Sequence, residues 1–528
     1  MANVAERDIA GARASNAGDR FHELWALRKA LSLLEPGARY KAMTVEGVPS
    51  EDASTSDGTW TAVDVCLMSG GLSLSEAEWA EFAQLKYSSA SPNSQWTIAR
   101  LVSNSAKNGN NSVMRKLAEA YEAAESTRLA KNPSLSYSVR LVSNQHIAND
   151  VLMALGRVDT PNETTALGAK EGRKVLRKAA GLSVKQFTSF ASLLDFSECG
   201  ADSLFEQERK AIQTLDRLIE GETRPSHLEL HRFISDAMLP TSSREPITEE
   251  VILSRLEVGT DYALYPCPNR VTPVSKAIER AAARDMVSKL VGGTRRIALH
   301  GRAGCGKTTT ISQISTMLPP GSVCIQYDCY GGGSYLDDSA PRHRPVEAFT
   351  QLSNEIAIRL RVPRLLRISD RGSPVRAFKE RLQLGADVLL ESNPEALLVV
   401  AIDAADNAVA AAGRRGDHCF VNELASIEEL PRNVRIVISA RTARLADLKL
   451  PPNFFSQTIE PFSFDETLAN VRAHVATPDA GWVKEFHGLT RGIPRVQAYA
   501  FEFSTDPGGA IQFLLPGGKG LGAILLTT

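Results

Sequence analysis

The sequence lacks an excess of charge of either sign. Its 60 lysine and arginine residues are balanced by 61 aspartate and glutamate residues, which gives a formal net charge of −1 at pH 7. A basic field over the whole chain, of the kind that attracts nucleic acid without a dedicated site, is therefore excluded. Any surface that binds DNA must be a local basic patch.

Paired cysteine motifs and long apolar runs are also absent. The seven cysteines are scattered along the chain, with no C-x-x-C pair and no matching histidine spacing. This pattern argues against a disulfide framework or a structural zinc site, and it is typical of a reducing compartment. The first residues, MANVAERDIAG, carry acidic side chains and lack the apolar core of a signal peptide. Because no stretch approaches the roughly 20 apolar residues of a membrane span, we expect a cytoplasmic protein with no membrane partner.

The alternation of strand and helix patterns predicts an α/β chain with four regions. Residues 1–240 combine one amphipathic helix with strand-like runs and then a mainly helical extension, and residues 241–264 predict a linker. In residues 265–455 the apolar runs RRIALHG, GSVCIQYDC, ALLVVAIDAA and NVRIVISAR alternate with helical patterns. This alternation is typical of βαβ units and a parallel sheet. Residues 456–528 predict a small helical part.

A phosphate-binding loop stands out in the third region. Residues Gly301–Thr308 read G-x-x-x-x-G-K-T and follow the apolar run IAL. In such a loop the backbone N–H groups and the following helix face the phosphates, the lysine reaches the β- and γ-phosphates, and the threonine hydroxyl can bind Mg²⁺. A glycine-rich turn without a ligand would need neither the full spacing nor the Lys-Thr pair. The predicted nucleotide-binding residues here are Gly301, Gly304, Gly306, Lys307, Thr308 and Thr309.

Three later strand or helix ends carry residues that suit the same nucleotide. Asp403 ends the apolar run LLVVAID, where a carboxylate can hold Mg²⁺, although it could also cap a helix. Asp406 could orient water, with a purely structural role equally open. Arg441 ends the run RIVISAR and could sense the γ-phosphate, and Pro494 in GIPR could approach the base. No guanine-reading N-K-x-D motif follows the loop, so we expect ATP with Mg²⁺.

These motifs resemble the STAND class of P-loop NTPases, which have an AAA-like parallel α/β core. The resemblance rests on GRAGCGKTTT, YDCYGGGSYL, PRHRPVEAFTQLSNEIA, LLVVAIDAADNA, ISARTARL and GIPR, and is most marked for bacterial antiviral proteins of the AVAST type. It implies an ATP-driven switch in which a sensed foreign protein causes a resting monomer to assemble. It also matches Lys307, Thr308, Asp403 and Arg441 to the P-loop, Walker B and sensor positions, and Pro494 to the proline beside the base.

The last residues depart from that class. Its members continue into a winged-helix element and a long helical-repeat sensor, whereas this sequence ends at GLGAILLTT soon after Pro494. The expectation is that the sensor is missing from this chain or lies on a partner.

A second polar set lies near the N-terminus. A helical stripe in RFHELWALRKALSLL is followed by three strand-like runs, MTVEGV, AVDVCLM and EFAQLKY. Asp64 lies on the second run, and Gln84 and Lys86 share one face of the third because alternate strand residues point the same way. An aspartate, an amide oxygen and a lysine at one sheet edge suit phosphodiester hydrolysis assisted by Mg²⁺. A solvated strand face is the alternative, and Glu51 and Asp52 compete with Asp64.

This arrangement resembles the PD-(D/E)xK nuclease superfamily in its Mrr-like variant. More narrowly it is similar to the double-strand-DNA endonuclease domain of CD-NTase-associated effectors, and SVRLVSNQHI resembles a later strand of that domain. The resemblance implies that Glu23, on the preceding helix, joins Asp64 and Gln84 as a metal ligand, while Glu46 is a weaker additional candidate. Asp64, Gln84, Lys86 and Glu23 are therefore the expected catalytic set.

A basic helix face follows the strand region. It is made of Lys170, Arg173, Lys174, Arg177 and Lys178, with Lys185 beyond. Such a face can neutralise DNA phosphates or simply be solvated. No base-reading motif accompanies it, so we expect little sequence preference.

Together these patterns lead to one expected function and two alternatives. The expected function is an ATP-dependent DNA endonuclease of antiphage defence that is activated by assembly into a homo-oligomer, expected to be a tetramer. Its partners would be double-stranded DNA and a phage protein that acts as trigger. The alternatives are a non-catalytic signalling scaffold and an ATP-driven restriction or DNA-processing enzyme, of which the second lacks helicase motifs.

Overall fold

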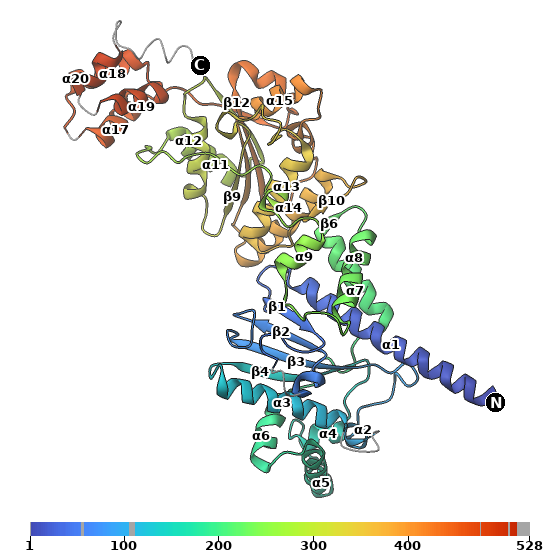
Figure 1. Ribbon diagram of the computed structural model, residues 1–528. Helices are drawn as coiled ribbons and strands as arrows, with labels where there is room; N and C mark the ends of the chain where they lie inside the picture. The colour runs from blue at the N-terminus through green and yellow to red at the C-terminus, as the bar shows by residue number, and fades with distance from the viewer. Residues whose placement is uncertain (1, 54–57, 105–110, 476, 505–506, 515–528) are drawn as a thin grey trace. The chain divides into compact units, whose positions relative to one another are not determined.

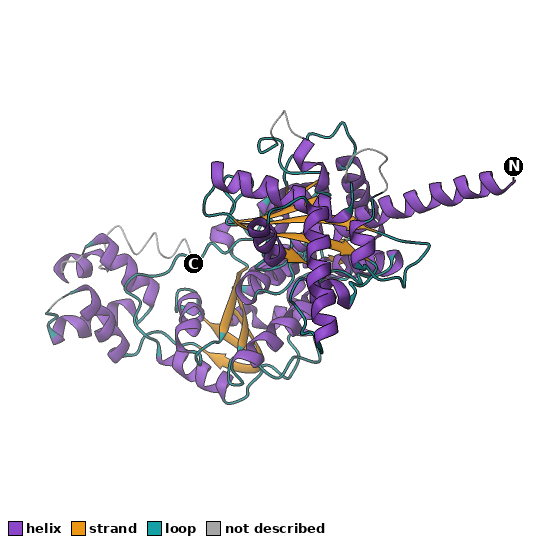
Figure 2. Cartoon of the chain, turned by 90° about the horizontal axis from the view of Figure 1, so that it is seen from below, coloured by secondary structure: helices purple, strands orange, loops and turns teal. Residues whose placement is uncertain are grey.

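The computed structural model describes residues 2–53, 58–104, 111–475, 477–504 and 507–514 (Figure 1). It divides the chain into two compact units, Met1–Gly259 and Thr260–Thr528, and each is described by itself. Both units combine sheets with helices, as the strands and helices in Figure 2 show. The prediction of an α/β chain is confirmed. Among the described residues, no helix combines the length and the apolar character needed to cross a membrane.

The first unit is built on a six-stranded mixed sheet with the order β5-β4-β3-β2-β1-β7. β1, β2 and β3 are antiparallel neighbours, whereas β3, β4 and β5 are parallel, and β7 closes the edge antiparallel to β1. The strands are β1 (Ala42–Val45), β2 (Val65–Ser69), β3 (Trp79–Lys86), β4 (Ser136–Ser143), β5 (Leu194–Asp195) and β7 (Ile247–Thr248), and a further short strand is β6 (Ile219–Glu220).

Helices cover both faces of this sheet. The α-helices are α1 (Ala2–Ser32), α2 (Ile98–Val102), α3 (Val113–Ala130), α4 (Asn149–Ala154), α5 (Glu163–Ala180), α6 (Val184–Leu193), α7 (Leu204–Leu218), α8 (Arg224–Ala237) and α9 (Glu249–Arg255), with a 3₁₀ turn at Gly58–Ala62. Phe82 and Tyr137 of the sheet share a core with Phe187 and Phe190 of α6 and with apolar residues of α3. The predicted apolar stripe along α1 is buried throughout. The 3.6-residue period in the sequence therefore identified the face of α1 that packs inside the unit.

The segment predicted as a linker, residues 241–264, is divided between the two units. The boundary falls at Gly259, but Ile247 pairs with Met43 and extends the sheet of the first unit. Ile247 and Thr248, which follow the loop-like stretch, form this edge strand, and so short a strand was not predicted.

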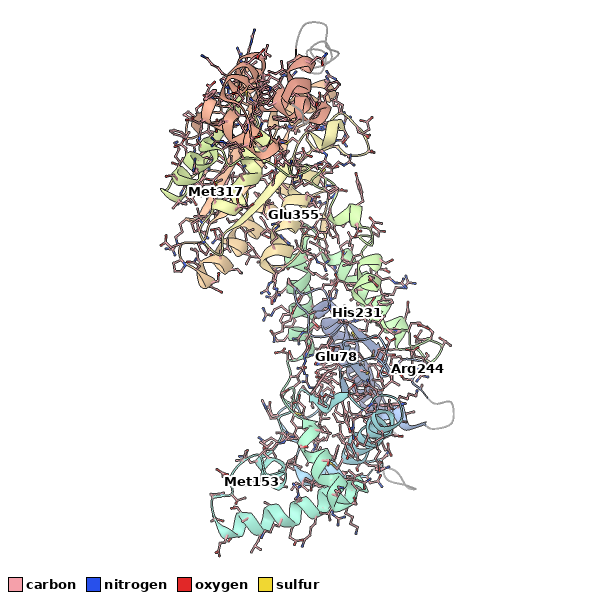
Figure 3. All side chains as sticks on the ribbon, turned by 90° about the vertical axis from the view of Figure 1, so that its left-hand side faces the viewer. Glu78, Met153, His231, Arg244, Met317 and Glu355 are labelled. Carbon is pink, nitrogen blue, oxygen red and sulfur yellow. The ribbon has the colours of Figure 1, made fainter. Side chains whose placement is uncertain are left out.

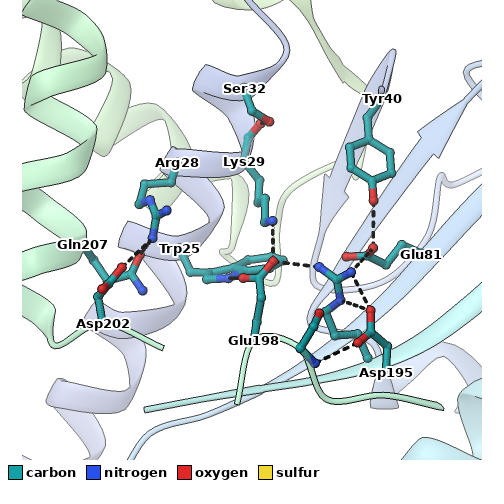
Figure 4. A network of polar contacts seen from close by, with 12 residues as sticks. Trp25, Arg28, Lys29, Ser32, Tyr40, Glu81, Asp195, Glu198, Asp202 and Gln207 are labelled. Atoms are coloured by element: carbon teal, nitrogen blue, oxygen red, sulfur yellow. Dashed lines mark hydrogen bonds and ion pairs between the residues drawn. The ribbon is translucent and has the colours of Figure 1, made fainter. Parts of the chain in front are cut away.

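A polar network holds α1 against the sheet of the first unit (Figure 4). Its centre is Arg140 of β4, whose guanidinium lies 3.0 Å from Glu81, 2.6 Å from Asp195 and 2.7 Å from Glu198. Glu198 also accepts hydrogen bonds of 2.6 Å from Trp25 Nε1 and from Lys29 Nζ, both on α1. One cation thus links β3, β4 and β5, and the shared Glu198 extends the link to α1.

The second unit is built on a five-stranded parallel sheet with the order β13-β8-β12-β11-β9. Its strands are β8 (Arg296–Gly301), β9 (Val323–Asp328), β11 (Leu398–Asp403), β12 (Val434–Arg441) and β13 (Phe455–Thr458), and a separate short strand is β10 (Arg367–Ile368). Every residue of β8 and β11 is buried. A parallel sheet covered on both faces has this continuous apolar composition.

Alternate residues of β11 point to the two covering layers. Val400 and Ile402 pack in the core made with α13 to α16, whereas Val399 and Ala401 pack in the core made with α11 and α12. The helices of this unit are α10 (Asp261–Leu264), α11 (Ala281–Val291), α12 (Lys307–Met317), α13 (Pro345–Leu360), α14 (Pro374–Ser392), α15 (Ala405–Arg415), α16 (Phe420–Ala425), α17 (Phe464–His474), α18 (Ala480–Thr490), α19 (Pro494–Phe503) and α20 (Pro507–Leu514), with 3₁₀ turns at Gly331–Gly333 and Thr442–Leu448.

The end of the second unit is helical. β13, at Phe455–Thr458, still belongs to the parallel sheet, so the sheet extends slightly past the predicted limit at residue 455. The described residues after it form α17 to α20 and no strand, and these helices share a small core that includes Val471, Val483 and Phe486. The expectation of a helical part is met, while no wing of a winged helix is present in that described segment.

We expect Arg140→Ala to destabilise the first unit by about 3–5 kcal/mol, because removing one partner of a buried ion cluster leaves the others uncompensated. Its side chain is 12% exposed and that of Glu81 is 1% exposed. Hydrogen exchange of the β3 and β4 amides measures the change. Arg209→Ala, which removes an exposed pair with Glu206, is the control and should leave protection unchanged. Equal protection in both variants would contradict a central role for Arg140.

Candidate functional site

The P-loop joins β8 to α12 with a tightly constrained backbone. Gly304 and Gly306 have φ values of +75° and +88°, which side chains other than hydrogen rarely tolerate. At Gly301 the φ angle is not the reason for glycine: a Cβ there would lie 2.5 Å from Ile459 Cγ2. All three predicted glycines therefore have a steric reason, and the first amides of α12 are free to face a phosphate.

The Lys307 side chain folds back on this loop. Its Nζ donates hydrogen bonds of 3.0 Å to the carbonyl oxygens of Gly301 and Arg302. Burial lowers the pKa of Lys307, while the nearby charges of Asp403 and Asp406 act in the opposite direction. The ammonium group is thus held at the mouth of the loop, and phosphate oxygens could replace the two carbonyls as its acceptors.

Asp403 lies at the centre of the candidate nucleotide site. Its two carboxylate oxygens accept hydrogen bonds of 2.6 Å, one from Thr308 Oγ1 on α12 and one from Ser439 Oγ on β12. Burial raises the pKa of Asp403, and these two hydroxyl groups oppose that rise. Strand β12 lies between the P-loop strand β8 and β11, so Asp403 reaches the loop through Thr308 and not as a direct strand neighbour. A hydroxyl and a carboxylate oxygen brought together in this way fit Mg²⁺, which prefers such ligands.

Asp406 and Arg441 form a pair beside this centre. Arg441 Nε lies 3.4 Å from Asp406 Oδ2, and its Nη2 donates a hydrogen bond of 3.5 Å to Asn407 Oδ1. Both charges act on Lys307, which places them within electrostatic range of the P-loop. The two residues predicted for sensing and water orientation are therefore together, but each partly neutralises the other. Thr309 lies in the first turn of α12, and its predicted role in nucleotide binding stays a prediction.

The start of α19 packs on the P-loop. Arg495 N donates a hydrogen bond of 3.2 Å to Gly304 O, and Pro494 Cγ lies 3.8 Å from the position of a Cβ at Gly306. Pro494 is thus placed against the phosphate loop. The GIPR motif therefore links the helical end of the unit to the P-loop.

Arg280 was not predicted, yet it connects the same parts. It is 3% exposed. Its guanidinium donates to Cys305 O in the P-loop at 2.8 Å, to Glu460 O at 2.9 Å and to Glu466 Oε1 on α17 at 3.0 Å. Nothing in its local sequence marks it, because all its partners are distant in the chain.

Asp328 was also missed. It ends β9 and pairs in register with Asp403, and its Oδ1 accepts hydrogen bonds from the backbone of Tyr330 and Gly331 at 2.9 and 3.0 Å. Its place at the end of the run VCIQYD was a usable signal, since carboxyl ends of parallel strands converge on one edge.

The first unit brings Asp64 and Gln84 into direct contact. Asp64 Oδ2 accepts hydrogen bonds of 2.6 Å from Gln84 Nε2 and 2.5 Å from Leu85 N. Lys86 lies two residues beyond Gln84 at the end of β3, and the charge of Asp64 acts on it. The three residues predicted from the strand pattern are thus at one sheet edge.

The electrostatics of this edge are unusual for side chains so close to solvent. Burial lowers the pKa of Lys86, although the charge of Asp64 opposes the change. Glu46 is exposed as a whole residue, but burial of its carboxyl group and the nearby charges of Asp64 and Asp19 raise its pKa to about 7. His22 on α1 lies 3.1 Å from Leu85 O, and burial lowers its pKa. Glu46 therefore lies close enough to Asp64 for their charges to interact, which keeps it as an additional candidate metal ligand.

Glu23 is not brought to Asp64. Its carboxylate accepts a hydrogen bond of 2.8 Å from Ser235 Oγ and lies 3.2 Å from His231 Nε2 (labelled in Figure 3). Both partners belong to α8, so Glu23 holds α1 to α8. The residues of α1 that influence the site electrostatically are Asp19 and His22. The sequence predicts the helix α1, but which of its side chains face Asp64 depends on how α1 packs against α8, and the sequence pattern of α1 does not contain that information.

The competing acids are also accounted for. Asp52 Oδ2 accepts a hydrogen bond of 2.7 Å from Leu74 N, and Asp52 Oδ1 lies 3.9 Å from Lys131 Nζ. Glu51 is exposed in the same turn. Asp64, in contrast, contacts Gln84 and Leu85 of β3, and its role as a metal ligand stays a prediction.

The oxygen atoms at this edge fit a divalent cation of the Mg²⁺ type. Gln84 Oε1 is buried and has no hydrogen-bond partner within the protein, while Asp64 and Glu46 supply carboxylates beside it. Buried polar atoms rarely stay unpaired in proteins. Over the described part of the chain, no group of three His, Cys, Asp or Glu side chains is arranged to hold a metal ion, so an amide oxygen would have to complete the set.

Comparisons with known proteins concern the fold. No protein-family model matches the sequence, and no curated protein matches it. A Walker-type ATPase of Pyrococcus abyssi is similar in structure, with a TM-score of 0.36, 16% identity, and coverage of 49% of this chain and 77% of that one. A STAND protein with a tetratricopeptide-repeat sensor from Pyrococcus horikoshii gives a TM-score of 0.27, 12% identity, and coverage of 46% and 33%.

A third solved structure, the Aeropyrum pernix Orc1 protein in complex with DNA, gives a TM-score of 0.26, 15% identity, and coverage of 46% of this chain and 63% of that one. All three similarities are distant. The P-loop NTPase fold of the second unit follows from its own parallel sheet and loop geometry.

We expect Lys307→Ala to weaken ATP binding about 10- to 150-fold, because hydrogen bonds to charged groups contribute about 1.5–3 kcal/mol. Titration with a fluorescent ATP analogue in the presence of Mg²⁺ measures the change. Lys484→Ala removes an exposed lysine of α18 and should bind as the wild type does. Equal affinity of all three proteins would remove Lys307 from the site.

Glu46 gives a pH-dependent prediction. Because its pKa rises from an ordinary 4.5 to about 7 in the folded protein, the folded state keeps a proton that the unfolded chain has lost between these values. The free energy of unfolding should therefore fall as pH rises from about 4.5 to 7. Glu46→Gln should remove this part of the pH dependence and be more stable than the wild type at pH 8. Solvent screening makes the change modest, and denaturation curves at pH 5 and pH 8 test its sign.

Proposed function

We propose that this chain is an ATP-dependent, Mg²⁺-dependent endonuclease that acts on double-stranded DNA after assembly. The observation that carries the proposal is the contact between Asp64 and Gln84 beside Lys86, at one sheet edge of a chain that also has a P-loop NTPase fold. A strand-end carboxylate, an amide oxygen without a partner and a lysine of lowered pKa suit phosphodiester hydrolysis assisted by a divalent cation.

The nuclease residues would have separate roles. Asp64 and Gln84 Oε1 would hold a divalent cation, with Glu46 as a further oxygen ligand after it loses its proton. When bound, that cation would neutralise charge on the scissile phosphate. Lys86 would orient the attacking water and offset the negative charge that develops on the phosphate oxygens. Its lowered pKa reduces the cost of giving up a proton.

The NTPase residues would sense and hold ATP. Lys307 would exchange its two loop carbonyls for phosphate oxygens, and Thr308 and Asp403 would bind Mg²⁺ in place of their mutual hydrogen bond. Ser439 stays on the second oxygen of Asp403 and keeps the carboxylate oriented. The Arg441–Asp406 pair would open as the γ-phosphate attracts the guanidinium, which frees Asp406 to orient water.

We further propose that this NTPase is a STAND switch of antiphage defence. A phage protein would be the trigger, ATP would favour a homo-oligomer, expected to be a tetramer, and assembly would bring two nuclease sites to one duplex. The motifs of the second unit and the packing of GIPR on the P-loop support this. Because cleavage would require assembly, the nuclease would be inactive in the resting monomer.

A non-catalytic signalling scaffold is the second candidate. It is favoured by the absence of a three-carboxylate metal cluster from the described residues. In that case Asp64 and Gln84 would stabilise the strand edge and the first unit would bind a partner.

The deciding experiment is cleavage of supercoiled plasmid by the full chain with Mg²⁺ and ATP, with and without lysate of phage-infected cells. We expect cleavage when assembly occurs, and a loss of about 100-fold or more in Lys86→Ala. ATP-dependent assembly, followed by sedimentation, should be unchanged in this variant.

The matched control is Lys131→Ala, which removes a lysine from the same unit near Asp52 and should cleave normally. If Lys86→Ala and the wild type protect cells equally from phage, the scaffold is correct. No cleavage by an assembled wild-type protein would overturn the nuclease proposal.

A further inference from the structure

Six cationic side chains of the α5–α6 hairpin fall into two sets in the structure. The first set is made of arginines that hold the hairpin together. Arg173 donates to Ala154 O at 3.4 Å and to Thr188 Oγ1 at 3.5 Å, and its guanidinium lies 5.3 Å from the Phe187 ring. Arg177 donates to Leu182 O at 3.2 Å. These two charges are therefore used within the protein.

The second set is made of lysines that face solvent. Lys170, Lys174 and Lys178 are exposed and recur every four residues, so they follow one face of α5 with a rise of about 6 Å per step. Lys185 is exposed in the first turn of α6. Lys174 is also 2.5 Å from Glu171, but such an exposed pair is readily exchanged for another anion.

The C-terminal end of α5 contacts the first turn of α3. Arg115, in the first turn of α3, donates a hydrogen bond of 2.7 Å to Ala180 O at the end of α5. The next residue, Lys116, lies within electrostatic range of Lys86. Helices α3, α4, α5 and α6 pack together in the first unit (Figure 1). The end of α5 and the strand edge are thus connected through the first turn of α3.

We propose that Lys170, Lys174, Lys178 and Lys185 form a surface that binds the sugar-phosphate backbone of double-stranded DNA, on a helical hairpin that the first turn of α3 connects to the candidate nuclease edge. The proposal rests on the proposed endonuclease function and adds to it the surface that holds the substrate. It names no base contact, because lysine ammonium groups act on phosphates as point charges.

The charge pattern favours a nucleic acid over a protein partner. Lysine is depleted in protein interfaces because its strongly hydrated ammonium group is costly to bury, whereas a row of lysines on one helix face is the footprint expected for a phosphate backbone. The same hairpin exposes Leu167, Val175 and Val184, which would suit a second copy of this chain instead. The experiment below therefore distinguishes DNA binding from self-association through this hairpin.

The salt dependence of DNA affinity tests this proposal, because it reports how many phosphates the protein neutralises. Each phosphate neutralised on duplex DNA contributes about −0.9 to the slope of log K against log salt concentration. Four contacts should therefore contribute a slope of about −3.6. The full chain, without divalent cation so that no cleavage occurs, is titrated with a fluorescent duplex of about two to three helical turns.

The fourfold variant carries Lys170→Gln, Lys174→Gln, Lys178→Gln and Lys185→Gln. We expect its slope to be less steep by about 3 to 4, and the fourfold Lys→Arg variant to keep the wild-type slope. A pair with equal charge change provides the matched control: Lys174→Gln/Lys178→Gln should lose about 1.8 of the slope, while Lys41→Gln/Lys131→Gln, at two exposed lysines of the same unit, should lose none.

Three results would overturn the inference. A wild-type slope in the fourfold variant, with plasmid cleavage intact, places the DNA surface elsewhere and leaves the endonuclease function standing. A normal slope together with lost self-association in sedimentation assigns the hairpin to a protein interface. A wild-type protein that neither binds duplex DNA nor cleaves plasmid overturns the endonuclease function together with this surface.

Discussion

A single buried carboxylate organises the candidate nucleotide site. Asp403, at the end of β11, accepts one hydroxyl hydrogen bond from α12 and one from β12, each of 2.6 Å. These two hydrogen bonds join β11 to β12 and to the helix that follows the P-loop. A charged group in such a position is tolerated only because both of its oxygens are satisfied. The order β8-β12-β11 makes this arrangement possible, since it places a hydroxyl-bearing strand between the loop and the carboxylate.

The candidate nuclease edge uses the same physical solution with different partners. Asp64 is restrained by an amide side chain and a backbone N–H of the neighbouring strand, which orients one of its oxygens. The difference lies in what surrounds the carboxylate. At Asp403 two hydroxyl groups satisfy both carboxylate oxygens. Beside Asp64, in contrast, the amide oxygen of Gln84 has no hydrogen-bond partner, and burial raises the pKa of Glu46 to about 7.

The sequence was sufficient where local pattern and chain order determine the contact. The P-loop glycines, Lys307 and Thr308 follow from a single continuous motif, and Gln84 and Lys86 share a face because strands alternate. It was insufficient where the packing of a distant helix decides. Glu23 turned toward α8 because His231 and Ser235 lie there, and no period within α1 contains that information.

The contacts of Arg280 with the P-loop carbonyl of Cys305, with Glu460 and with Glu466 of α17 have a kinetic consequence. Any movement that carries α17 away from the P-loop must break the hydrogen bond between the buried Arg280 guanidinium and Glu466, and it therefore passes through a state in which these two opposite charges have lost each other as partners. Such a state is high in free energy whichever arrangement is finally more stable. Departure of the helical end should therefore be a rare, all-or-none event, and thermal fluctuation alone should seldom release it.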